Sequence, residues 1–368
     1  TPATGTPALF WNSPGGGTII TFLRVDIKDF SQGWLVNSSL GPNIASGYFF
    51  DRCTSYNSQV THMYCVARRV AILGGNFDYS GNHIAYCENI MEGVIDGNTF
   101  SRPAYGRAAL RISGAGTDYP ASNCWVANNQ FEGWIDPISD TSAHNGGGTR
   151  YNYCLLNFSP NTPNSERFGE WLVFENNTVT DCESFAIIAA WEHVIVRNNI
   201  FTSPDPYQNN RSFFCLDHVP TWSRRPLNDV QVVDNTFEYT GSLAAGTKGM
   251  IGLYDCGYGP HTGIVVARNI FRSSDTDVKF ISVPEAEASF ACLASENNLV
   301  YSADGAAPLS EAPQADVPAP SPTLVRTDLD VPVLVFSTET DLSADGLGYS
   351  AARQPDTDHV RGWEVAGT

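Results

Sequence analysis

Acidic, imidazole and aromatic side chains recur where short apolar segments of this sequence end. Glu192 and His193 follow one such segment, Asp217 and His218 follow the next, and Asp255 follows a third. Carboxylates that lie close together push one pKa upward, which creates an acid/base pair, and glycoside hydrolysis requires paired carboxylates. We therefore predict these five residues as catalytic, with Asp217 and Asp255 as the acid and base and the histidines assisting proton transfer. The alternative is that they cap strand ends and face water.

The same carboxylate oxygens are ligands that Ca²⁺ prefers. A bound Ca²⁺ would bridge an acidic protein to an acidic sugar, so the cofactor stays open, with Ca²⁺ as one candidate. The nine cysteines form no CxxC pair and no Cys/His cluster with metal-ligand spacing. We expect most of them to be small buried residues and predict no metal site from them.

Further residues suit substrate binding. Two aromatic residues border the acids and can stack on a sugar ring, and two arginines fall some repeats earlier on the same side. A glycine-rich loop in the longest repeat interval adds a histidine and an arginine, and loops on a rigid scaffold often carry function; a merely solvated loop is the alternative. The predicted substrate-binding residues are Trp191, Tyr254, Arg107, Arg111, His144 and Arg150.

A short pattern recurs along most of the chain: two β-branched or apolar residues, one or two polar residues, Asn, any residue, then Phe or Val. Short β-branched runs favour strands, and Asn tolerates the left-handed backbone of a sharp corner. Stacked in register, such asparagines can form a hydrogen-bonded ladder, after which Phe or Val re-enters the interior. Val70–Phe77 is a degenerate copy. The key asparagines are Asn98, Asn129, Asn177, Asn199, Asn235, Asn269 and Asn298.

A second strand is expected after each Asn corner. The uneven spacing of the corners indicates that some coils are bare and others carry excursions, which usually map to one face of a repeat protein. The expected second strands are Ala109–Ile112, Ala186–Ala190, Phe213–Leu216, Met250–Leu253 and Phe280–Val283.

These repeats resemble those of pectate-lyase-like parallel β-helix proteins over about residues 15–303. The resemblance implies an all-β fold, a right-handed parallel β-helix (solenoid). It implies no single activity, because that superfamily includes lyases, hydrolases, epimerases, phage adhesins and non-catalytic proteins. We find no compact motif of a pectin hydrolase or an alginate epimerase, and no GxSxG nucleophile elbow.

The formal net charge of −18 makes nucleic acid a poor partner, because a field of that sign repels phosphate backbones. It would also repel an acidic polysaccharide unless a local arginine patch or bound cations intervened. No apolar run reaches transmembrane length, so we expect no membrane span.

The composition changes to Ala, Pro, Ser and acidic residues around 304–323, which predicts a linker. The segment after it resembles the last part of an α/β-hydrolase family, in which an acid follows a late strand and a catalytic His lies further on. By that likeness Asp341 or Glu339 would match the triad acid. His359 precedes the matching His position, no nucleophile is present, and we expect no hydrolase activity. A truncated or fused reading frame would produce such a segment.

The sequence thus predicts a β-helix over residues 1–303, a linker over 304–323, and a short, incomplete α/β-hydrolase-like fragment over 324–368. The leading functional prediction is a carbohydrate-active protein, secreted or at the cell surface, that acts on a polysaccharide as a lyase or a glycoside hydrolase. The alternative is a non-catalytic β-helix for binding or adhesion, and the third is a remnant of an α/β-hydrolase fusion. Substrate, disulfide pairing and oligomeric state stay open.

Overall fold

The computed structural model describes most strands of the chain and the turns between them, and every structural statement below concerns this part. The chain divides into two compact units, Thr1–Leu309 and Ser310–Thr368, each treated by itself. The described residues are 10–12, 19–30, 33–37, 47–104, 107–113, 121–133, 155–159, 169–182, 185–203, 214–216, 225–240, 249–254, 259–274, 278–282, 293–302, 333–338 and 360–365.

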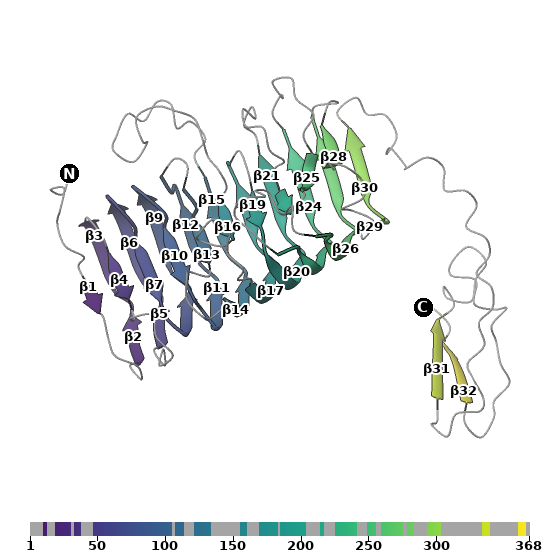
Figure 1. Ribbon diagram of the computed structural model, residues 1–368, viewed down its shortest axis with the longest axis horizontal. Helices are drawn as coiled ribbons and strands as arrows, with labels where there is room; N and C mark the ends of the chain where they lie inside the picture. Colours follow the sequence, from purple (N-terminus) through teal and green to yellow (C-terminus); the bar gives the residue numbers. More distant parts are fainter. Residues whose placement is uncertain are drawn as a thin grey trace. The chain divides into compact units, whose positions relative to one another are not determined.

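The first unit is a parallel β-helix built from three ten-stranded parallel sheets (Figure 1). Neighbouring strands in every sheet are three strands apart in the sequence, so each coil gives one strand to each of sheets A, B and C in turn. This confirms the expected all-β solenoid. Among the described residues no helix is long and apolar enough to cross a membrane.

The strand bounds follow the order of the coils. Sheet A contains β1 (Phe10–Asn12), β4 (Trp34–Asn37), β7 (Met63–Val66), β10 (Ala85–Glu88), β13 (Leu110–Ser113), β16 (Leu156–Phe158), β19 (Ala186–Ile188), β22 (Phe214–Leu216), β25 (Gly249–Leu253) and β28 (Lys279–Ser282). Sheet B contains β2 (Ile19–Leu23), β5 (Gly47–Asp51), β8 (Arg69–Leu73), β11 (Glu92–Asp96), β14 (Ser122–Ala127), β17 (Gly169–Glu175), β20 (Trp191–Arg197), β23 (Asn228–Val233), β26 (Thr262–Ala267) and β29 (Leu293–Glu296). Sheet C contains β3 (Asp26–Phe30), β6 (Thr54–Ser58), β9 (Asn76–Ser80), β12 (Thr99–Ser101), β15 (Gln130–Glu132), β18 (Thr178–Thr180), β21 (Ile200–Ser203), β24 (Thr236–Tyr239), β27 (Ile270–Ser273) and β30 (Leu299–Ser302).

Each coil therefore has three strands, one more than the repeat suggested. The strand directly after an Asn corner belongs to sheet C and is only three to five residues long. The segments expected as second strands, such as Met250–Leu253, instead lie in sheet A and follow at the next corner. Sequence periodicity missed the sheet C strands as separate elements because so few residues carry them.

The predicted asparagine ladder is confirmed at the corner between sheets B and C. The Oδ1 atom of Asn129 accepts hydrogen bonds from the backbone N–H and the Nδ2 group of Asn98, both at 2.9 Å. The same Nδ2 group also donates to the carbonyl oxygen of Ile72 at 2.8 Å. This pattern continues from coil to coil up to Asn298. The ladder thus satisfies buried polar groups that would otherwise destabilise the corner.

The left-handed residue at this corner is the one before the ladder asparagine. Gly97, Asn128 and Asp234 have φ values of 68°, 56° and 57°. The degenerate repeat copy puts Gly75 at the ladder position, where its N–H donates to Asn98 Oδ1 at 2.8 Å. The corner therefore needs two residue types in succession: one that tolerates positive φ and one that bonds along the stack.

A column of phenylalanines from sheet C fills the interior, as the repeat predicts. Phe77 stacks on Phe100, and Phe100 on Phe131, with ring centroids 5.3 Å apart in both pairs. Further along, Phe201 stacks on Phe237 at 4.8 Å. These rings are fully buried, so each contributes about 1.5–3 kcal/mol of hydrophobic stabilisation.

Buried thiols also line the interior. Cys65 and Cys87 are register partners on adjacent coils, and a hydrogen bond with Cys87 together with burial raises the pKa of Cys65. The described cysteines are buried, as expected for small core residues; they are Cys53, Cys65, Cys87, Cys124, Cys182 and Cys215.

The second unit contains a two-stranded parallel sheet of β31 (Val333–Thr338) and β32 (Val360–Val365). β31 ends directly before Glu339, one of the two acids that the resemblance places after a late strand. Two parallel neighbours need a crossover connection, which is the basic unit of α/β folds. The α/β character expected of this fragment stays a prediction.

Candidate functional site

Glu192 and His193, the predicted catalytic residues that the structure describes, do not lie at the end of a sheet A strand. Ile188, Leu216 and Leu253 are register partners, so Tyr254 aligns with Ala189 of the same column. Glu192 and His193 come later and belong to β20 of sheet B. The corner between the two strands went unrecognised because Ala190 adopts the left-handed conformation, with φ 57°, where Gly or Asn usually marks a turn.

Several predicted site residues lie outside the described residues, and their roles stay predictions. Two are the carboxylates chosen as acid and base, and two belong to the glycine-rich loop. They are Asp217, His218, Asp255, His144 and Arg150.

The two predicted aromatic residues are less accessible than a sugar platform requires. Trp191 is 2% exposed and packs over Gly169, where an added Cβ would lie 2.2 Å from the indole ring. Tyr254 is half-buried against a small apolar cluster that includes Ile187 and Cys215. Neither residue therefore enters our proposal as a sugar-stacking group.

Three neighbouring strands of sheet B carry a left-handed residue near their start, which turns a side chain outward. Trp171, His193 and Asp229 have φ values of 61°, 56° and 52° and are skipped in the strand register, in which Glu170 pairs with Glu192. Because the skipped residues lie opposite one another on consecutive coils, Trp171, His193 and Asp229 form one column.

The side chains of this column contact one another. The Trp171 ring, 54% exposed, stacks on His193 with centroids 4.2 Å apart and planes 18° apart. Nδ1 of His193 lies 2.8 Å from Oδ2 of Asp229. A carboxylate bonded to one ring nitrogen fixes the orientation and tautomer of the imidazole, which leaves Nε2 for proton transfer.

A second column beside it brings two carboxylates into register. Glu170 and Glu192 are Cα partners on adjacent coils, and Asn228 follows in the next coil. Both glutamates are half-buried. We call Glu170, Trp171, Glu192, His193 and Asp229 the edge cluster. It combines an oriented imidazole, neighbouring carboxylates and an exposed aromatic ring.

Sequence reasoning found Glu192 and His193 but missed the other members of the edge cluster. A signal was present: Trp171, His193 and Asp229 each precede the ladder asparagine of their own coil by six residues. It could only be read once the coils had been aligned on the ladder.

The predicted arginines lie at a separate place: Arg111 is in β13 of sheet A, and Arg107 lies just before that strand. The guanidinium of Arg111 lies 4.9 Å from the centre of the Tyr86 ring. On the neighbouring coil Tyr64 donates a hydrogen bond from its hydroxyl to Oε2 of the buried Glu88 at 2.8 Å. Burial and Glu88 raise the pKa of Tyr64, so this phenol stays protonated at neutral pH. These contacts form a rigid polar patch.

Arg107 and Arg111 both act on the buried His83. The Nδ1 atom of His83 accepts a hydrogen bond from the backbone N–H of Ala108 at 2.9 Å. Burial lowers the pKa of His83 to about 3, and the positive charges of Arg111 and Arg107 add to the effect. His83 is therefore neutral, and the two arginines supply the positive charge beside it.

No group of three or more His, Cys, Asp or Glu side chains able to hold a metal ion is found within the ranges described above. The carboxylates that suggested Ca²⁺, Asp217 and Asp255, fall outside those ranges. The described residues therefore do not decide the cofactor, and Ca²⁺ stays one candidate.

Comparison with known families matches residues 294–368 to an alpha/beta hydrolase domain. Neither the curated proteins nor the solved structures contain a match to this chain. The family match agrees with the resemblance of the C-terminal segment and starts further upstream than expected.

The first residues of that match continue the solenoid. β29 and β30 pair with sheets B and C, and Asn298 receives the ladder hydrogen bonds of Asn269. The triad candidates Glu339 and Asp341, and also His359, lie outside the described residues. The hydrolase likeness therefore contributes no site geometry.

Proposed function

We propose that the protein is a carbohydrate-active β-helix protein that binds a polysaccharide along the outside of the helix and cleaves it at the edge cluster. The observation that carries this proposal is the oriented imidazole. His193 is held by Asp229 on one side and lies against the exposed Trp171 on the other. An aromatic face beside a proton-transfer group can hold a sugar ring next to the bond that breaks.

The chemistry assigns distinct tasks to the edge cluster. In hydrolysis, Nε2 of His193 would donate a proton to the glycosidic oxygen as the C–O bond breaks, while Glu170 or Glu192 takes a proton from the attacking water. In elimination, the same imidazole would instead remove the proton on the carbon next to a sugar carboxylate. The neighbouring glycosidic C–O bond would then break, a C=C bond would form, and the leaving oxygen would take a proton from water. Both reactions need His193 as a proton carrier and Asp229 as its positioning residue.

A secreted or cell-surface location is part of this proposal, because the proposed substrate is an extracellular polysaccharide. The acidic balance of the chain, with a formal net charge of −18, favours a neutral sugar chain over an acidic one. An acidic polysaccharide would need Arg107 and Arg111 to offset the negative charge of the protein.

The test is a screen of the purified chain against neutral and acidic polysaccharides, with and without Ca²⁺, that records both reducing ends and unsaturated products. We expect turnover on one class and a loss of about a hundredfold in kcat for His193→Gln. Trp171→Ala should mainly raise KM, and Asp229→Asn should lower kcat and displace the pH profile.

Two matched variants control for general damage. Trp125→Ala removes another exposed tryptophan of sheet B, and Asp234→Asn removes a carboxylate that pairs with Arg268 at a different corner. Both should retain full activity. Turnover that survives His193→Gln would rule out the edge cluster, and an absence of turnover on every substrate would favour the non-catalytic binding function.

The family match raises the alternative of a serine hydrolase. Since the sequence contains no GxSxG elbow, we expect no labelling by a serine-directed fluorophosphonate probe. Labelling that Glu339→Gln or Asp341→Asn abolished would assign the hydrolase activity to the C-terminal segment.

A further inference from the structure

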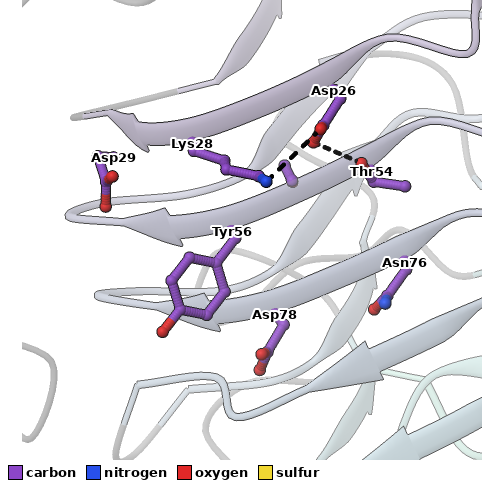
Figure 2. A pocket seen from close by; sticks show the side chains of 8 residues that line it. Asp26, Lys28, Asp29, Thr54, Tyr56, Asn76 and Asp78 are labelled. Atoms are coloured by element: carbon purple, nitrogen blue, oxygen red, sulfur yellow. Dashed lines mark hydrogen bonds and ion pairs between the residues drawn. The ribbon is translucent and has the colours of Figure 1, made fainter.

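An open groove crosses sheet C in the coils near the N-terminus, away from the strands that carry the edge cluster. Side chains of β3, β6 and β9 line it, and its volume is about 510 Å³, within the usual range for ligand sites (Figure 2). The strand register builds it from two outward columns. Asp26, Thr54 and Asn76 form one, and Lys28, Tyr56 and Asp78 form the other.

Two of the three carboxylates that line this groove pair with cations of the protein. Nζ of Lys28 lies 3.7 Å from Oδ2 of Asp26, whose Oδ1 accepts a hydrogen bond from the Thr54 hydroxyl at 2.7 Å. Nε of Arg102 donates to Oδ1 of Asp78 at 2.8 Å. The third carboxylate, Asp29, accepts a hydrogen bond from Nδ2 of Asn57 at 2.6 Å. A charged ligand that bound Asp26, Lys28 or Asp78 would have to break the ion pairs. A neutral polyol can use the remaining lone pairs of the same carboxylates and break none of them.

An aromatic ring stands beside these polar groups with a fixed orientation. Tyr56 is 43% exposed and stacks on Tyr79, with ring centroids 6.1 Å apart and planes 20° apart. The Arg102 guanidinium lies 5.1 Å from the centre of the Tyr79 ring and braces the pair. A rigid, half-exposed aromatic ring offers an apolar platform at little entropic cost.

We infer that this groove on sheet C is a second carbohydrate-binding site, which takes a short stretch of a neutral sugar chain. Hydroxyl groups of the sugar bond to Asp26, Asn76 and Asp78, while an apolar ring face stacks on Tyr56. The groove holds a substrate chain and does not cleave it. The ligand class rests on the proposed function, but the site uses different strands and can be altered alone.

The chain contains a closely matched control for the aromatic platform. Tyr301 also points outward from sheet C, is 42% exposed, and lies 5.8 Å from the Arg272 guanidinium. It belongs to β30, at the far end of the sheet from the groove. Tyr301→Ala therefore removes an equally exposed tyrosine from the same kind of environment.

The test measures binding of neutral cello-, manno- and xylo-oligosaccharides and of acidic oligogalacturonate to the full chain by isothermal titration calorimetry. We expect a neutral oligosaccharide to bind, Tyr56→Ala to weaken its binding about tenfold or more, and Tyr56→Phe to retain it. Tyr301→Ala should bind like the unaltered protein. Equal affinity in Tyr56→Ala, an equal loss in Tyr301→Ala, or binding of oligogalacturonate alone would overturn the inference.

A second measurement separates this inference from the proposed function. His193→Gln should lower kcat about a hundredfold and leave calorimetric binding at the groove unchanged. Binding that depends on Tyr56 in a protein without turnover would support the groove and reject the edge cluster. Turnover that depends on His193, with binding indifferent to Tyr56, would do the reverse.

Discussion

Two regions of the β-helix use the same left-handed backbone for different purposes. At the corner between sheets B and C, the residue after the left-handed one is turned inward, and the stacked asparagines bond to one another along the helix. Near the start of the sheet B strands, the left-handed residue itself is turned outward and differs from coil to coil. The inward column of one residue type stabilises the fold, whereas the outward column brings different side chains into contact and forms the candidate site.

This comparison predicts that the inner ladder tolerates little change. Asn199 accepts two hydrogen bonds from Asn177, at 2.8 and 3.1 Å, and donates one to the carbonyl of Phe174 at 3.0 Å. Asn199→Ala would leave these buried groups unpaired, so we expect a loss of about 3–5 kcal/mol in the free energy of unfolding. Chemical denaturation followed by circular dichroism measures it.

The adjoining residue supplies the control. Asn198 is exposed and left-handed, with φ 56°, a conformation that glycine adopts without steric cost. Asn198→Gly should change the free energy of unfolding by less than about 1 kcal/mol. Equal losses in the two variants would mean that the corner depends on its backbone and not on the ladder.

The second prediction concerns the support of the outward column. Gly169 and Trp191 are register partners at the start of β17 and β20, and an alanine Cβ at residue 169 would overlap the Trp191 ring. Gly169→Ala should therefore destabilise the fold by about 1–3 kcal/mol. Since Trp171 and His193 follow two residues later, catalysis should also fall.

A smaller ring should relieve that overlap. The double variant Gly169→Ala with Trp191→Leu should be more stable than the sum of its single variants predicts. Additive losses would show that the two positions do not compete for space.

The same comparison explains how far the sequence could lead. The ladder position requires an amide that accepts and donates, and the position two residues later requires a buried Phe or Val, such as Phe100 or Val179. Such strict demands leave a readable repeat, which predicted the β-helix and its core. The first coils escape the pattern, because Cys53 and Gly75 occupy the ladder position there.

The candidate site was harder to predict for the opposite reason. The outward left-handed position near the start of the sheet B strands accepts Asn123, Trp171, His193, Asp229 or Gly263, so no residue type identifies it. Their closeness follows from the strand register, which the sequence shows only after the coils are aligned. The groove on sheet C likewise depends on side chains brought together from separate coils.

The corner between sheets C and A differs from the other two regions because it buries an ionisable ring, His83, and its stability should therefore depend on pH. The folded pKa of His83 is about 3, well below its ordinary value of 6.5. Between these values the unfolded chain binds more protons, so stability is retained above pH 6.5 and falls as the pH is lowered towards 3. The slope from this one group is at most about 1.4 kcal/mol per pH unit.

His83→Asn should flatten that part of the pH dependence. An asparagine Oδ1 can replace Nδ1 as the acceptor for the Ala108 N–H, so the backbone contact is kept while the titrating group is lost. Unfolding curves measured between pH 4 and 7 would give the two slopes. A variant with the unchanged slope would mean that other groups govern acid sensitivity and that His83 takes up its proton without opening the corner. A flattened pH dependence of the free energy of unfolding would instead show that the corner between sheets C and A, unlike the ladder, is stable only while its buried imidazole is neutral.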